Sequence, residues 1–170
     1  MNLDGQEIKV SLEEYLSSAR ETVGPGEETR LEFSFLQNGV RKDEILRDGK
    51  LVSVAGLGLS TSANKNATIQ IWKDDSTWYI RSATHLQVME MATQQIGAIH
   101  ADSIQPLKLR SLYQWADGAF VVRAIHENSR LDYISEQDEK LAENYPDGLK
   151  IKVTDSSGQE LNTGFFPSVS

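Results

Sequence analysis

Asp74 and Asp75 are adjacent carboxylates, a residue type that serves both as metal ligands and as general acids and bases. Catalysis by two carboxylates needs the pair on separate sides of the reacting bond, and neighbours on a turn lack that separation. A calcium site needs further oxygen ligands, and the surrounding sequence has no calcium-loop spacing. We therefore predict that both residues belong to a turn, where an aspartate side chain accepts hydrogen bonds from nearby backbone N–H groups.

The three histidines, His85, His100 and His126, have no metal-ligand spacing. His100 and Asp102 are spaced like part of a catalytic pair, but the G-x-S-x-G turn that exposes a nucleophilic serine is absent. The glycines of residues 55–60 (AGLGLS) do not match the G-x-G-x-x-G phosphate-binding pattern. The chain has no cysteine, which excludes thiolate ligands and cysteine nucleophiles. The sequence thus predicts no catalytic, metal-binding or cofactor-binding residue, and we expect no enzyme.

Trp72, Trp78 and Tyr79 flank the two aspartates and form a dense aromatic cluster. Such side chains stack on a nucleic-acid base or a sugar, or they pair across a hairpin and stabilise it. The two tryptophans have equal parity, which predicts that they share one hairpin face, in the core or at a subunit interface. The predicted interaction residues of the whole chain are Trp72, Trp78, Tyr79, Gln95, Phe165 and Phe166.

The net charge of −8 is concentrated toward the two ends of the chain. Residues 1–60 hold 11 acidic and 7 basic groups, and residues 131–170 hold 8 acidic and 3 basic groups. An acidic chain repels phosphate, and the best basic cluster, within residues 41–50, has the character of a solvated strand face, so we expect no nucleic-acid partner. No run of 18 apolar residues and no signal-peptide core occur. We therefore expect no membrane partner and no export by a general signal peptide.

The first of three predicted helices covers residues 11–23. Ser11 and Glu14 form a capping box, in which each side chain accepts a hydrogen bond from the other residue's backbone N–H. Gly24-Pro25-Gly26 then ends the helix. Its apolar stripe at helical spacing consists of Leu12, Tyr15, Leu16, Ala19 and Val23.

The second predicted helix, near residues 83–99, is the longest and is capped by Ser82 or Thr84. Gln95 falls inside its apolar face, and a buried glutamine needs partners, so we expect it to bond neighbouring backbone or to face a partner subunit. Ser135 caps a third, short acidic helix. The apolar face of the second helix consists of Val88, Met91, Ala92, Ile96 and Ile99.

Turn signals between alternating segments predict four hairpins. Asn38-Gly39 is the strongest of these signals, because a type I′ turn needs positive φ at both positions. Asp48-Gly49 leads into a further strand, residues 50–59, in which Gly56 and Gly58 mark a bulge or a close backbone approach. The four hairpins have their turns at residues 38–39, 73–76, 117–118 and 155–158.

Hairpins alternating with helices predict an α+β fold, with an antiparallel sheet built from hairpins and about three helices. A length of 170 residues fits one domain. We therefore predict a single α+β domain, 1–170, with residues 131–170 as a separable C-terminal subregion.

Residues 72–102 (WKDDSTWYIRSATHLQVMEMATQQIGAIHAD), with VAGLGLSTSANKN before them, resemble an uncharacterised C-terminal module of phage tail-fibre and tail-assembly proteins. The module is similar in having a Trp, an acidic turn, a short strand, a Ser/Thr/Ala start and a long helix, although an intervening helix of such modules has no counterpart here. The resemblance covers about residues 55–103 and implies no catalytic residue. The positions that carry it are Trp72, Asp74, Asp75, Ser82, Ala83, Leu86 and Ile96.

These observations favour a non-enzymatic phage structural or tail-associated protein that acts through protein–protein contacts. Its expected partners are further copies of the chain or other virion components, and the location that the resemblance implies is the virion or the host cytoplasm. The alternative is an acidic intracellular inhibitor or immunity protein that binds a basic effector, because acidic ends would steer it toward such a partner. An enzyme whose motif is not recognisable in the sequence is the third hypothesis.

Overall fold

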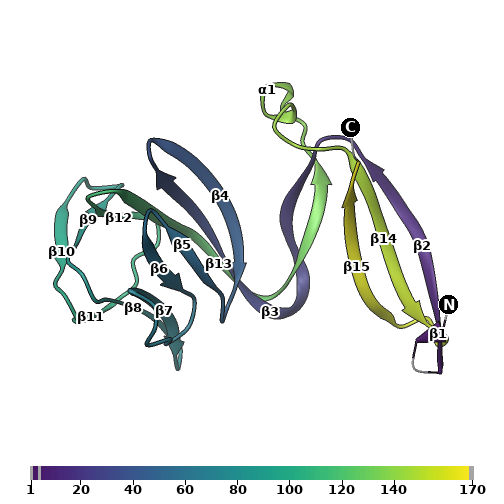
Figure 1. Ribbon diagram of the computed structural model, residues 1–170, viewed down its shortest axis with the longest axis horizontal. Coiled ribbons are helices and arrows are strands. Elements are labelled where there is room, and N and C mark those ends of the chain that lie inside the picture. The colour runs from purple at the N-terminus through teal and green to yellow at the C-terminus, as the bar shows by residue number, and fades with distance from the viewer. Residues whose placement is uncertain (1, 4, 169–170) are drawn as a thin grey trace. The chain divides into compact units, whose positions relative to one another are not determined.

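The computed structural model describes residues 2–3 and 5–168, which form two units (Figure 1). Unit 2 is the continuous segment Pro25–Arg130, whereas unit 1 combines the described residues of 1–24 and 131–170. In the sequence, unit 2 therefore lies between the two segments that form unit 1.

The predicted α+β class is wrong, because the described residues are almost entirely β. Strands hold 66% of the residues and helices 2%, and no described helix reaches seven residues. The third predicted helix is reduced to α1 (Glu139–Ala142). Its cap is Asp138, whose side chain accepts a hydrogen bond from the Lys140 backbone N–H, and not Ser135.

Residues 11–23 form parts of two strands instead of the first predicted helix. β2 (Gln6–Leu16) ends just before Ser18, whose φ of 49° turns the chain into β3 (Ala19–Gln37). β2 pairs with β14 (Gly148–Asp155), which lies far away in the sequence. This long-range pairing overrides the helical spacing of the apolar residues, and no local signal reveals it.

Residues 83–99 form a hairpin instead of the second predicted helix, because β9 (Leu86–Glu90) pairs with β10 (Ile96–Ile99). Over such short segments the same apolar residues fit both a 3.6-residue and a 2-residue period. Gly97 disfavours the helix by about 1 kcal/mol. Ser82, one of the two expected helix caps, is buried, and its hydroxyl oxygen instead accepts a hydrogen bond from the backbone two residues later.

The four predicted hairpins are all present. Asn38 and Gly39 have φ values of 52° and 75°, the left-handed conformation that a type I′ turn requires. The hairpins join β3 to β4 (Val40–Arg47), β7 (Ile69–Asp74) to β8 (Thr77–Ser82), β12 (Ser111–Trp115) to β13 (Gly118–Ser135), and β14 to β15 (Glu160–Pro167).

The predicted strand 50–59 is divided into β5 (Leu51–Val54) and β6 (Leu57–Ser60). Ala55 and Gly56 have φ values of 45° and 82° and form the turn between these strands. Gly56 therefore marks a tight turn and not a bulge.

Unit 2 contains two facing sheets (Figure 1). The larger has the strand order β10-β9-β12-β13-β3-β4, and the smaller has the order β11-β8-β7-β6-β5, where β11 is Ile104–Pro106. β6 and β7 pair in parallel. β3 and β13 extend beyond unit 2, because residues 19–24 of β3 and residues 131–135 of β13 belong to unit 1.

The core of unit 2 combines side chains from both sheets. Its aromatic part is a cluster in which Tyr113 stacks on Phe120, with ring centroids 5.0 Å apart, and Phe33 lies tilted against Phe120 at 6.0 Å. The smaller sheet contributes aliphatic side chains. Burial of this apolar surface is the main stabilising contribution to unit 2. The fully buried large residues include Leu31, Phe33, Leu59, Ile69, Ile71, Ile80, Leu86, Ile99, Tyr113, Phe120 and Val122.

Unit 1 is built on a four-stranded sheet with the order β1-β2-β14-β15, where β1 is Asn2–Leu3. β14 pairs antiparallel with both β2 and β15. The register of these three strands decides which side chains share a face of this sheet.

Candidate functional site

The aromatic hairpin β7–β8 places its two tryptophans on opposite faces, so the predicted shared face is wrong. Trp72 lies opposite Tyr79, with ring centroids 6.0 Å apart, whereas Trp78 lies opposite Lys73 and packs against the core. The turn begins at Asp75, whose φ of 53° fixes this register. Parity alone does not reveal which residues face each other, because the turn length decides it.

Gln95 is exposed in the connection between β9 and β10, and not on a buried helical face. Its backbone oxygen accepts a hydrogen bond from Glu90, which closes the turn. Phe165 and Phe166, both in β15, point to opposite faces of the unit 1 sheet, because successive strand residues alternate. The structure therefore distributes the six predicted interaction residues over both units and does not gather them into one site.

The candidate catalytic and metal-binding groups are also separate. Asp102 forms an ion pair with Arg81 at 2.6 Å, and His100 contacts His85 with ring centroids 5.6 Å apart. His126 Nε2 lies 3.0 Å from Glu32 Oε1 in another part of the unit. Within residues 2–3 and 5–168, no group of three or more acidic or histidine side chains could hold a metal ion.

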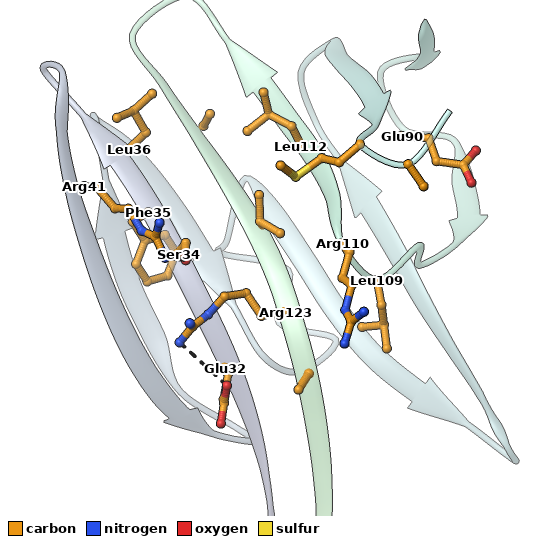
Figure 2. Close-up of a pocket in the computed structure, with 15 residues that line it drawn as sticks. Glu32, Ser34, Phe35, Leu36, Arg41, Glu90, Leu109, Arg110, Leu112 and Arg123 are labelled. Carbon is orange, nitrogen blue, oxygen red and sulfur yellow. Dashed lines mark hydrogen bonds and ion pairs between the residues drawn. The ribbon is translucent and has the colours of Figure 1, made fainter. Parts of the chain in front are cut away.

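A groove of about 900 Å³ lies over β3, β12 and β13 of the larger unit 2 sheet (Figure 2). Its lining includes the apolar residues Leu36, Leu112 and Val121 and the arginines Arg41 and Arg110. Residues from strands that are far apart in the sequence form this groove, so no sequence motif indicates it.

Two of the three arginines that line the groove, Arg41 and Arg123, are held by carboxylates. Arg123 lies 3.6 Å from Glu32 and 3.7 Å from Asp43, and Arg41 bonds Asp43 at 2.9 Å. Partial burial raises the pKa of Asp43, but hydrogen bonds from Arg41 and Ser34 and the charge of Arg123 outweigh it, so the pKa is lowered overall. The Asp43 carboxylate therefore stays ionised at neutral pH, and the groove combines apolar side chains with fixed charges.

The unit 1 sheet exposes one apolar surface, which we name the apolar face. Register places its members together: Leu149 lies opposite both Tyr15 and Phe166, and Ile151 lies opposite Leu12. The side chains of Leu12, Tyr15 and Phe166 are 63%, 59% and 57% exposed. The apolar face consists of Val10, Leu12, Tyr15, Leu149, Ile151, Val153 and Phe166.

The opposite face of the same sheet is covered in part within unit 1. Phe165 stacks on Tyr133 with ring centroids 4.7 Å apart, and Lys150 forms a 2.7 Å ion pair with Asp132. Leu16 on this side is 2% exposed. The large apolar side chains of the apolar face have no such cover, because five of them (Val10, Leu12, Tyr15, Leu149 and Phe166) are between 42% and 63% exposed.

Unit 1 also carries the entire net charge of the chain. Its two segments hold 13 acidic and 5 basic residues, a net charge of −8, whereas unit 2 holds 12 of each. Four of these acidic residues lie in or beside α1: Glu136, Asp138, Glu139 and Glu143. Among the described residues, Asp147 and Asp155 lie at the two ends of the apolar face.

Asp147 ties one end of the apolar face to the β2–β3 turn. Its carboxylate accepts hydrogen bonds from the Ser18 backbone N–H at 2.7 Å and from the Tyr15 hydroxyl at 2.8 Å. The Ser18 hydrogen bond, followed by that of Tyr15, holds the pKa of Asp147 below its usual value of 3.8. The same contact raises the pKa of the Tyr15 hydroxyl.

We expect unit 1 to lose stability in acid through this contact. Because the folded-state pKa of Asp147 is lowered, its contribution is fully present above the ordinary carboxyl value of 3.8 and is lost as pH falls through the lower folded value. Asp147→Asn should weaken this pH dependence, while Asp117→Asn in unit 2 should leave it unchanged. Urea unfolding followed by the amide NMR signals of β2, at pH 6 and at about pH 2.5, measures the difference; equal dependence in both variants would contradict the assignment.

The only described helix is four residues long, so no helix in residues 2–3 and 5–168 could cross a membrane. Comparisons of the chain with protein-family models, with curated proteins and with solved structures find no match.

Proposed function

We propose that this chain is a non-enzymatic structural protein, of the kind found in phage virions and tails, that acts through protein–protein contacts. The observation that carries this proposal is the apolar face of unit 1. Soluble proteins rarely expose a contiguous apolar patch of several hundred Å² unless it binds something. Seven large apolar side chains on one face of a three-strand segment form such a patch.

The composition of the apolar face fits a protein partner. It combines two aromatic side chains, Tyr15 and Phe166, with branched aliphatic residues, and aromatic residues are enriched at the centres of protein interfaces. Its charged residues lie at the ends, as expected for an interface with an apolar centre and a polar rim. Partners are further copies or other virion components, and the corresponding location is the virion, or the host cytoplasm before assembly.

A second candidate function is supported by the charge distribution. An acidic inhibitor or immunity protein would present its −8 unit to a basic effector, and electrostatic attraction would raise the association rate. Such binding weakens as salt is raised, because the Debye length falls from about 10 Å at 0.1 M to about 3 Å at 1 M. A contact made by the apolar face is not weakened in this way, since hydrophobic burial is not screened.

The test is incorporation into particles. We expect virions purified on a density gradient, from a culture of the phage that encodes the chain, to contain it at a fixed ratio to the other structural proteins. A tagged Leu12→Lys chain supplied in the same culture should be depleted from the particles, because a charge in the centre of the apolar face opposes its burial. The matched control is Val40→Lys, a 67% exposed position on β4 of unit 2. Recovery of the wild-type chain only outside the particles would contradict the structural role.

A further inference from the structure

We infer that the apolar face is covered by the same face of a second copy, so that two unit 1 sheets pack face to face in a two-fold dimer. This inference rests on the proposed function and names its first partner. A two-fold contact joins the same patch on both subunits, so each residue type must be compatible with its own neighbours on the other copy. The apolar face meets this condition, because its centre consists of Leu12, Leu149 and Ile151 and contains no ionic side chain.

The arrangement of strands favours sheet-on-sheet packing. β2 and β14 present a row of apolar side chains on one side, to which β15 adds Phe166. Two such sheets pack about 10 Å apart with interdigitated side chains. On the covered side, unit 1 already packs its sheet against other strand residues, through Phe165 and Tyr133. Pairing through the apolar face would give the same sheet an apolar layer on each side.

The available area is sufficient for a dimer. An aromatic side chain buries roughly 150–250 Å² when it is fully covered, so Tyr15 and Phe166, which are 59% and 57% exposed, each offer on the order of 100 Å². With the aliphatic members included, the face offers on the order of 500 Å² per copy, or about 1,000 Å² in a dimer, which is the lower range for a specific interface. We therefore expect a reversible dimer and not a permanent one.

The charge of unit 1 gives this dimer a characteristic salt dependence. Two copies bring two −8 units together, and their repulsion opposes association at low salt. Added salt screens the repulsion but leaves hydrophobic burial intact. The dimer should therefore become tighter between 0.05 M and 1 M NaCl, whereas a complex held by opposite charges becomes weaker.

Sedimentation equilibrium of the full chain, from about 1 μM to about 500 μM, tests the inference directly. We expect a monomer–dimer equilibrium that shifts toward dimer at 1 M NaCl. Leu12→Lys should weaken the dimer at least about 10-fold, while Val40→Lys should not change it. Leu12 is 63% exposed, so its replacement should leave the unfolding midpoint close to that of the wild type.

Mixing two variants identifies the symmetry. Leu12→Lys and Leu12→Glu should each be monomeric, because like charges meet in each homodimer. If the two faces pack on each other, an equimolar mixture places opposite charges in one interface, and it should associate more strongly than either variant alone. A mixture that behaves as the average of its components would overturn the two-fold arrangement.

The remaining outcomes also decide the question. A wild-type chain that is monomeric at every concentration and salt, or a dimer unaffected by Leu12→Lys, would overturn self-pairing, and so would a dimer that dissociates as salt is raised. Flotation of a monomeric chain with phosphatidylcholine vesicles would identify lipid as the occupant and would also overturn it. None of these results depends on incorporation into particles, so this inference and the proposed function fail separately.

Discussion

Replacement of Phe120 by alanine is expected to lower the free energy of unfolding of unit 2 by about 3–5 kcal/mol. Phe120 on β13 is fully buried and lies among three aromatic rings, at centroid distances of 5.0 Å from Tyr113, 6.0 Å from Phe33 and 6.3 Å from Trp115. Alanine removes the transfer free energy of the ring and leaves a cavity, which rigid flanking strands cannot collapse to fill.

Tryptophan fluorescence in urea measures this loss without interference from unit 1. The three tryptophans, Trp72, Trp78 and Trp115, all belong to unit 2. Val40→Ala on exposed β4 is the control, and its effect should stay within about 0.5 kcal/mol. A Phe120→Ala midpoint equal to that of the control would show that the aromatic stack does not form the centre of the core.

The second large effect is expected at Gly26. A Cβ added there would lie 2.5 Å from the Ser129 backbone oxygen and 2.7 Å from the Arg130 Cβ. The closest contact is to a backbone atom, so no side-chain rotation relieves it, and β3 must move away from β13. Gly26→Ala should therefore destabilise unit 2 by about 1–3 kcal/mol, or more if the strands cannot separate locally.

Gly97→Ala is the matched control for this substitution. Gly97 lies on β10 of the same sheet, has no atom within 4 Å of an added Cβ and has no positive φ. Alanine there should stabilise the protein by about 0.4–1 kcal/mol, because it reduces the conformational freedom of the unfolded chain. In the same fluorescence experiment, the two Gly→Ala substitutions should therefore change the free energy of unfolding in opposite directions. Changes in the same direction would show that the close approach of β3 to β13 is incorrect.

Gly26 also illustrates where sequence reasoning succeeded and where it could not. Turns with a local cause were predictable, as at Asn38-Gly39, where two residues suited to positive φ lie between alternating segments. Gly24-Pro25-Gly26 was predicted to end a helix but lies inside β3, and Gly26 is needed for contact with a strand about one hundred residues later. A glycine required by a distant backbone cannot be distinguished, in the sequence, from one required by a local turn.

The two incorrect long helices have a related cause. Residues 11–23 and 83–99 contain apolar residues at a spacing compatible with both helix and strand. Each segment forms strands because it pairs with a strand elsewhere in the sequence. The strand alternation Leu149, Ile151, Val153 was visible, since that segment was predicted as part of a hairpin. The apolar face depends on the pairing of this segment with β2. That pairing could not be predicted, because the two strands lie near opposite ends of the sequence.

The interrupted course of unit 1 has a consequence for synthesis of the protein. Unit 2 is continuous and can fold once its last strand has left the ribosome, whereas β2 is made long before β14, the strand with which it pairs. At about 5–20 residues per second, the N-terminal segment waits on the order of ten seconds for its partner. During that interval Val10, Leu12 and Tyr15 belong to an unpaired, apolar strand segment that is prone to associate with other nascent chains. The step that exposes this protein to aggregation in the cell is therefore the delay before β2 meets β14, and expression conditions that slow translation should lower its soluble yield.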